Sequence, residues 1–138
     1  MTDSDGPDLM AFRDALDARQ AAVVDEVHRT IAEAAPGLVP PIRTGSMLGY
    51  GRFHYRYDSG REGDAHLISL RGGSRQLSIY VSAVEDGRYL PEAHVPTLGK
   101  VSVGRSCIKV TRSGDLDLAG FADVVRRAVE LGGEGQVR

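Results

Sequence analysis

The hydrophobic period of this chain changes from helical to alternating and then back to helical. Between Val24 and Ala34, apolar residues recur every three or four positions, which places them on one face of a helix. Arg52–Tyr57 instead alternates aromatic side chains with arginine and histidine, the pattern of a half-buried strand. Helical spacing returns between Leu118 and Leu131. Because helical segments flank a run of strands, the sequence predicts an α+β domain with helices packed on a sheet.

Capping residues mark where the predicted helices begin. Pro7 stands in the first turn of a short N-terminal helix, where the N–H that proline lacks has no partner in the helix. Asp17 and Gln20 form a variant of the capping box, so a second helix is expected to begin there and to end before the next proline–glycine pair. Asp115 or Asp117 is expected to cap the closing helix.

The residues between these helices predict four to five strands. Short polar turns, most of them containing glycine, separate consecutive apolar or alternating segments. We therefore expect an antiparallel β-sheet with a meander order, with the N-terminal helices and the C-terminal helix packed on one face. The expected strands are 52–57, 66–71, 76–83 and 106–111, with a further short one at 101–103.

The length of 138 residues fits one domain, because two smaller pieces would each bury too little surface. We expect residues 1–6 to be a disordered lead, residues 7–133 to form the domain and residues 134–138 to be a flexible tail. The formal net charge of -2 lacks the basic excess of general nucleic-acid binders. No apolar run approaches the roughly 20 residues of a membrane span. Neither a nucleic acid nor a membrane is therefore predicted as a partner.

The N-terminus and the cysteine content indicate the compartment. The first residues are acidic and polar, whereas a signal peptide begins with positive charge followed by an apolar stretch. Cys107 is the single cysteine, so no intramolecular disulfide is predicted. A chain with one thiol and no export signal is expected in the reducing cytoplasm.

A succession of short motifs runs through the middle of the chain. It comprises Ala35-Pro36-Gly37, Pro41-Ile42, Gly45–Gly51, Gln76–Val81, Leu98–Ile108 and the helix entry Asp115–Leu118. In order and spacing, over about residues 22 to 130, this succession resembles the YdhG-like family, domain of unknown function 1801. The resemblance implies a compact α+β fold with an antiparallel sheet and packed helices. It implies no settled activity, although one branch of that family has been proposed as an intracellular iron chaperone.

Residue types found in catalytic and metal sites are present without the usual spacing. Gly45–Gly51 holds three glycines but lacks the ending of a phosphate-binding loop, so these glycines are expected to permit a bulge or a close approach of strands. The histidines lack the close spacing of zinc ligands, although His54 and His66 flank a hairpin where a weak two-histidine site is conceivable. We predict no catalytic residue, no metal site and no cofactor.

The parity of two strands predicts a candidate ligand-binding face. If Ile79 and Ile108 point toward the helices, their neighbours Tyr80 and Lys109 point away from them. Such a face suits a small anionic or aromatic ligand, or a second subunit. The alternative is a partly wet antiparallel face without a ligand. The expected site residues are Tyr50, Tyr80, Arg105, Cys107 and Lys109.

These features together predict a non-enzymatic module that binds a small molecule or a protein. One alternative is a homo-oligomer that uses the same sheet face as its interface. Another is a metal- or iron-handling protein, which follows from the family resemblance together with carboxylates in the turns, among them Glu62, Asp64 and Glu85.

Overall fold

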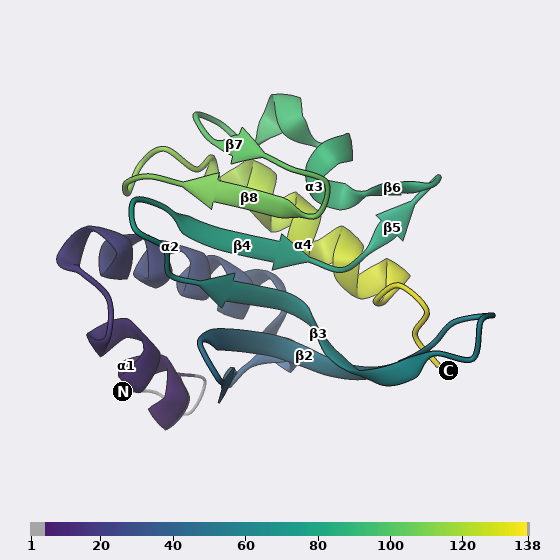
Figure 1. Ribbon diagram of the computed structural model, residues 1–138. Coiled ribbons are helices and arrows are strands. Elements are labelled where there is room, and N and C mark those ends of the chain that lie inside the picture. Colours follow the sequence, from purple (N-terminus) through teal and green to yellow (C-terminus); the bar gives the residue numbers. More distant parts are fainter. Residues whose placement is uncertain (1–4, 138) are drawn as a thin grey trace.

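The computed structural model describes residues 5–137 as a six-stranded antiparallel sheet with helices on one face (Figure 1). The strands are β1 (Ile42–Thr44), β2 (Met47–Arg56), β3 (Glu62–Arg71), β4 (Leu77–Val81), β7 (Ser102–Val103) and β8 (Cys107–Val110), and a separate ribbon is formed by β5 (Val84–Glu85) and β6 (Arg88–Tyr89). The helices are α1 (Gly6–Asp14), α2 (Ala18–Ala34), α3 (Leu90–Ala93) and α4 (Leu118–Leu131), with short 3-10 turns η1 (Pro36–Leu38) and η2 (Val95–Thr97). The predicted α+β class is confirmed, with slightly more strands than expected.

The strand order follows a meander only as far as β4. Strands β1 to β4 are antiparallel neighbours in chain order. The strand that pairs with β4 on its other side is β8, whereas β7 lies outside β8 at the edge of the sheet. The chain between β4 and β7 forms the β5–β6 ribbon, α3 and η2, and this long segment carries it past the position of β8. The meander prediction is therefore wrong beyond β4.

Aspartate side chains cap both long helices. Asp17 Oδ1 accepts a hydrogen bond from the Gln20 N–H at 2.8 Å, and Asp117 Oδ1 accepts one from the Gly120 N–H at 3.0 Å. The Gln20 side chain does not return to its own helix end, as a complete capping box requires. It donates to the Gly73 carbonyl at 2.6 Å instead, and so ties α2 to the turn between β3 and β4.

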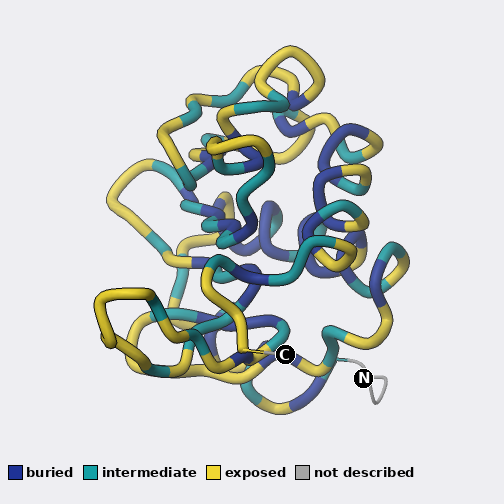
Figure 2. The backbone as a smooth tube through the Cα atoms, turned by 90° about the vertical axis from the view of Figure 1, so that its right-hand side faces the viewer, coloured by how far each residue is buried: buried dark blue, intermediate teal, exposed yellow. Residues whose placement is uncertain are grey.

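The hydrophobic core lies between the sheet and the two long helices, where the buried segments gather (Figure 2). In β4 the side chains of Ile79 and Val81 are fully buried, and Tyr80 between them is only half-buried. In β8, Ile108 is fully buried and Lys109 is exposed. The predicted parity of these two strands is confirmed, so β4 and β8 turn their polar side chains away from the helices.

The long β2–β3 hairpin changes the parity of its buried side chains at Gly51. Before this residue, Leu48 and Tyr50 are fully buried. After it, the buried side chain is Phe53, and His54 is exposed. Gly51 has a φ of 71°, which other residues rarely adopt and which lets the strand kink here. After the kink, the odd-numbered aromatic side chains of β2 therefore point to the same face of the sheet as Leu48 and Tyr50 do before it.

The segment after α4 lies along the outer half of β2 (Figure 1, yellow). The Arg56 N–H donates to the Gly135 carbonyl at 2.8 Å, and the Val137 N–H donates to the His54 carbonyl at 2.9 Å. Strand β1 pairs only with the first residues of β2, so the outer half of this edge of β2 is unpaired by β1. The C-terminal segment forms a short antiparallel pairing there.

Glycines allow this C-terminal segment to approach aromatic side chains closely. A Cβ atom at Gly133 would overlap the ring of Phe53, and one at Gly135 would overlap the ring of Tyr57. Residues 134–137, for which the sequence predicted a flexible tail, thus pair with β2 through backbone contacts, and no side-chain pattern in the sequence indicates this pairing. Residue 138 lies outside the described residues.

The first helix begins one residue before the predicted start of the domain. The predicted lead covers residues 1–6, but α1 already begins at Gly6, with Asp5 as its N-cap residue. Residues 1–4 lie outside the described part. None of the helices within residues 5–137 is long and apolar enough to cross a membrane.

Candidate functional site

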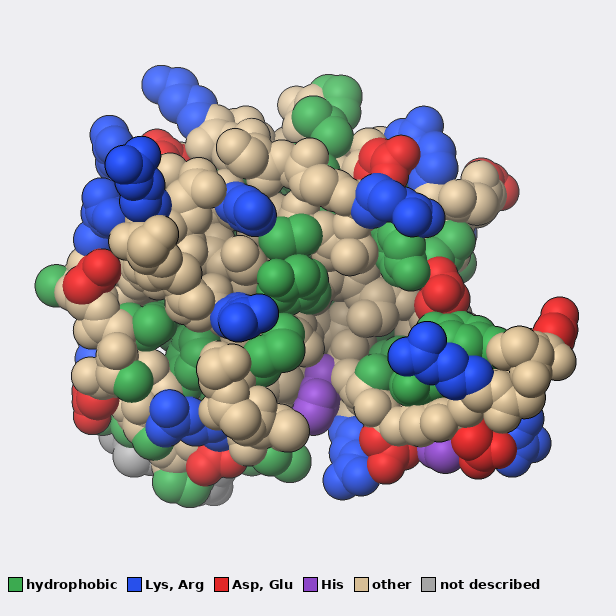
Figure 3. Space-filling model, in the orientation of Figure 1, with side chains coloured by type: hydrophobic (Ala, Val, Ile, Leu, Met, Phe, Trp, Pro, Cys, Tyr) green, Lys and Arg blue, Asp and Glu red, His purple; other side chains and the backbone are tan. Residues whose placement is uncertain are grey.

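Three of the five predicted site residues share the outer face of the sheet. Tyr80 pairs with Cys107 across β4 and β8, and Ser78 pairs with Lys109 two residues along the strands. Tyr80 and Cys107 are half-buried, whereas Lys109 is exposed. Figure 3 shows this face, with hydrophobic side chains near its centre and cationic side chains beside them. These three residues therefore lie on the face to which the sequence assigned them.

Tyr50 lies on the opposite side of the sheet. It is fully buried, and its hydroxyl oxygen is 2.8 Å from His28 Nδ1, while His28 Nε2 is 2.9 Å from Asp5 Oδ1. Burial and then the charge of Asp5 raise the pKa of Tyr50, so its hydroxyl stays protonated. The prediction that Tyr50 joins the ligand-binding face is wrong, because this residue precedes the kink at Gly51 and points under the helices.

Arg105 lies at the end of the sheet, in the turn before β8. Its guanidinium carbon is 5.9 Å from the centroid of the Tyr89 ring, a cation–π contact. Tyr89 belongs to β6, outside the six-stranded sheet. Arg105 therefore borders the outer face and also supports one wall of a neighbouring recess.

This recess lies between the β2–β3 hairpin, the end of β4, β6 and the C-terminal segment, and we call it the tyrosine recess. Its volume is about 180 Å³. On the right of Figure 3, hydrophobic side chains flank a hollow in this region. The lining residues are Phe53, Tyr55, Tyr57, Arg61, Ala65, Ser82, Tyr89 and Glu134.

Only part of the tyrosine recess has a signal in the sequence. The alternation of Phe53, Tyr55 and Tyr57 places three aromatic rings on one strand face, as the pattern predicted. Tyr89 and Glu134 come from a two-residue strand and from a segment without periodicity. Both residues reach the recess only because the whole chain folds as it does, so no local pattern in the sequence indicates their positions.

Tyrosine hydroxyls and one carboxylate interact inside the recess. The rings of Tyr55 and Tyr57 lie with centroids 5.0 Å apart, tilted by 31°. The Glu134 side chain interacts with both Tyr57 and Tyr89. Burial and the Glu134 carboxylate raise the pKa of both tyrosines, so both remain neutral hydrogen-bond donors at neutral pH. Arg61 also lines the recess, and no carboxylate within the described residues forms an ion pair with it.

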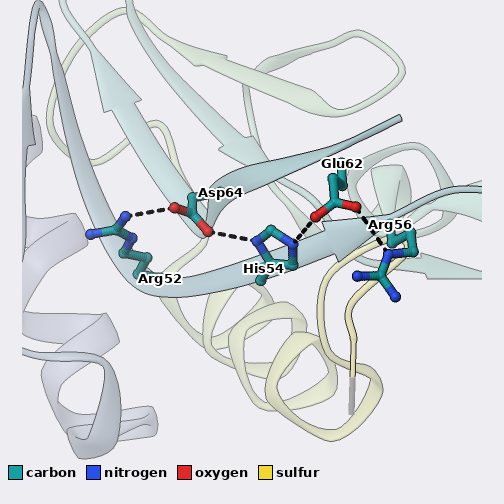
Figure 4. Close-up of polar contacts among 5 residues, drawn as sticks. All are labelled: Arg52, His54, Arg56, Glu62 and Asp64. Atoms are coloured by element: carbon teal, nitrogen blue, oxygen red, sulfur yellow. Dashed lines mark hydrogen bonds and ion pairs between the residues drawn. The ribbon is translucent and has the colours of Figure 1, made fainter. Parts of the chain in front are cut away.

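A chain of exposed polar contacts occupies the other face of the same hairpin (Figure 4). Arg52 contacts Asp64 at 2.6 Å, and Asp64 lies 2.9 Å from His54 Nδ1. His54 Nε2 lies 3.1 Å from Glu62, which contacts Arg56 at 3.2 Å. The two carboxylates approach opposite nitrogens of the His54 ring, so they do not converge on one point. Among residues 5–137, no group of three or more His, Cys, Asp and Glu side chains is arranged to hold a metal ion.

His66 does not face His54 across the hairpin. Its ring packs over Gly49, where a Cβ atom would overlap the imidazole. Gly49 therefore permits a close approach between strands, as expected for this glycine-rich segment. Nε2 of His66 is buried without a hydrogen-bond partner in the described part of the chain, and burial lowers its pKa. The two-histidine arrangement considered from the sequence is not formed.

The contacts of His54 predict a pH-dependent hairpin. Hydrogen bonds to Asp64 and then to Glu62 raise the pKa of His54 above 6.5, and the same contacts lower the pKa of both carboxyl groups. Protonated His54 therefore stabilises the hairpin below about pH 6.5, and this contribution is lost as the pH rises through the raised pKa. The carboxylates contribute above about pH 4, and their contribution is lost as the pH falls through their lowered pKa values.

An NMR titration of the His54 ring measures this effect. The pKa of His54 is expected above 6.5 in the unmodified chain and closer to 6.5 in Asp64→Asn. Asp58→Asn is the matched control, because Asp58 lies in the same hairpin turn and has no contact with His54. A pKa at or below 6.5 in the unmodified chain would contradict the contacts in Figure 4.

Comparisons of this chain with protein-family models, with curated proteins and with solved structures find no significant match. The resemblance to the YdhG-like family therefore stays a prediction from the sequence motifs. Function has to be inferred from the side chains that the fold brings together.

Proposed function

We propose that this chain is a binding module that holds a small molecule in the tyrosine recess. The observation that supports this proposal is the lining, which combines four aromatic side chains with one acidic residue, Glu134, and one basic residue, Arg61. Small-molecule sites typically combine such apolar walls with a few polar groups that fix orientation. A cavity of about 150 Å³ accepts benzene, so a volume of about 180 Å³ suits a ligand slightly larger than benzene.

The protonation states in the recess favour binding over proton transfer. General acid–base catalysis is most effective when the pKa of the catalytic group lies near the working pH. The pKa values of Tyr57 and Tyr89 are raised further from neutrality by burial and by the Glu134 carboxylate. These groups are suited to hold a ligand by hydrogen bonds, which supports a non-enzymatic role.

Two-dimensional NMR with a library of small polar and aromatic compounds tests the proposal. Compounds that bind are expected to shift the ring resonances of Tyr55, Tyr57 and Tyr89. Ser82→Phe is expected to abolish these shifts, because Ser82 lines the recess and a phenyl ring there fills it.

The matched control is Tyr80→Phe, on the open outer face, which is expected to leave the same shifts unchanged. Shifts confined to Tyr80, Cys107 and Lys109 would place the ligand on the outer face and overturn the proposal. The absence of any binding compound at millimolar concentration would overturn it as well.

A further inference from the structure

The two opposite charges in the tyrosine recess define the ligand more closely. We infer that the recess binds a small zwitterion, a free amino acid or an equivalent molecule with an ammonium and a carboxylate group. Glu134 binds the ammonium group, Arg61 binds the carboxylate, and the aromatic rings cover the apolar part. This inference rests on the proposed function, since it assumes that the recess is the ligand site.

Glu134 retains free capacity to accept hydrogen bonds. An ionised carboxylate offers about four lone-pair positions. Within residues 5–137 no basic side chain forms an ion pair with Glu134, so positions remain for an ammonium group even with Tyr57 and Tyr89 beside the carboxylate. The aromatic faces nearby add to the attraction, because their negative electrostatic potential favours a cation. The Glu134 side of the recess is therefore suited to positive charge.

Arg61 supplies the complementary charge. Its guanidinium carries five N–H donors in a planar arrangement that matches a carboxylate. It lines the recess, and within residues 5–137 it has no carboxylate partner that a ligand would have to displace. Arg105, which lies over the Tyr89 ring, adds positive charge at the outer side of that wall. The Arg61 side of the recess is therefore suited to a carboxylate.

Ligands with a single charge, or with none, fit this lining less well. A simple organic cation would meet Glu134 favourably but would desolvate Arg61 beside it. A simple carboxylate would do the reverse. An apolar ligand would remove water from both charges without replacing the lost hydrogen bonds, which is costly for charged groups. A zwitterion satisfies both charges at once.

Calorimetric titrations of the full chain with matched compounds test this inference. The common amino acids are first screened by the ring shifts of the recess tyrosines. Each amino acid that binds is then compared with the amine that lacks its carboxylate and with the acid that lacks its ammonium group. For proline these are pyrrolidine and cyclopentanecarboxylate. The zwitterion is expected to bind at least ~10-fold more tightly than either analogue, the lower end of what a charged hydrogen bond contributes.

Two variants assign the charges to their residues. Glu134→Gln is expected to weaken binding of the amino acid by ~10-fold or more while leaving the acid that lacks its ammonium group unaffected or better bound. Arg61→Gln is expected to weaken binding of the amino acid equally and to leave binding of the amine that lacks its carboxylate unchanged. Glu92→Gln and Arg112→Gln remove the same charges elsewhere on the surface and are expected to change neither affinity.

The outcomes separate this inference from the proposed function. If the matched amine or the matched acid binds the recess as tightly as the amino acid, the site holds a ligand but the zwitterion is the wrong class. If uncharged compounds shift the recess tyrosines and no amino acid does, the inference likewise fails alone. If no compound of any class binds the recess, both fail.

Discussion

Ile108→Asp is expected to be unfolded in water at room temperature, whereas Lys109→Asp is expected to fold. The Ile108 side chain is fully buried between the sheet and the helices. A carboxylate at this position would lose its hydration without gaining a partner, at a cost of several kcal/mol. Domains of this size are stable by only about 5–15 kcal/mol. Lys109, the next residue of β8, is exposed, so the same new side chain there has little effect.

Circular dichroism and proton NMR of the two variants measure this difference. The pair is matched, because both variants introduce the same side chain into the same short strand. A folded Ile108→Asp variant together with an unfolded Lys109→Asp variant would reverse the two faces of the sheet. That result would also contradict the placement of Tyr80 and Cys107 on the face of the sheet that points away from the helices.

Gly120→Ala is expected to destabilise the fold by about 1–3 kcal/mol, the range for overpacking a tight contact. Helix propensity alone predicts the opposite sign, since alanine is more favourable than glycine inside a helix by about 1 kcal/mol. A Cβ atom at Gly120 would overlap the carbonyl oxygen of Thr97. Because that atom belongs to the backbone, it cannot move aside as the end of a flexible side chain does.

Urea denaturation gives the free energy of unfolding for this comparison. Gly37→Ala is the control, because no atom lies within 4 Å of the added Cβ. Its free energy of unfolding is expected to stay within about 0.5 kcal/mol of the unmodified chain. A Gly120→Ala variant as stable as the unmodified chain would contradict the close packing of α4 on the segment around Thr97.

Features whose causes lie within a few residues were predictable from the sequence. Asp17 and Asp117 cap α2 and α4 because an aspartate side chain reaches an N–H only three residues away. The faces of β4 and β8 follow from alternation over four or five residues. The predicted bounds of the closing helix agree with α4 (Leu118–Leu131) for the same reason.

Features that depend on distant contacts were not predictable in this way. The position of Tyr50 depends on the kink at Gly51, and nothing in the local pattern reveals that this glycine has a positive φ. The pairing of β8 with β4 depends on how far the intervening segment carries the chain. The tyrosine recess needs Tyr89 and Glu134 beside the hairpin, and their neighbours in sequence give no indication of that contact.

The origin of Glu134 has a consequence for protein synthesis. The hairpin, the end of β4 and β6 all precede Glu134 in the chain, so the ribosome releases the aromatic walls of the recess before the carboxylate. Until that residue has emerged and paired beside β2, a nascent chain lacks half of the charge pair that the proposed ligand needs. A ligand that needs both charges can therefore bind only after residue 134 has reached its place beside β2. Binding then stabilises the folded chain by an amount that grows with the logarithm of the ligand concentration divided by the dissociation constant.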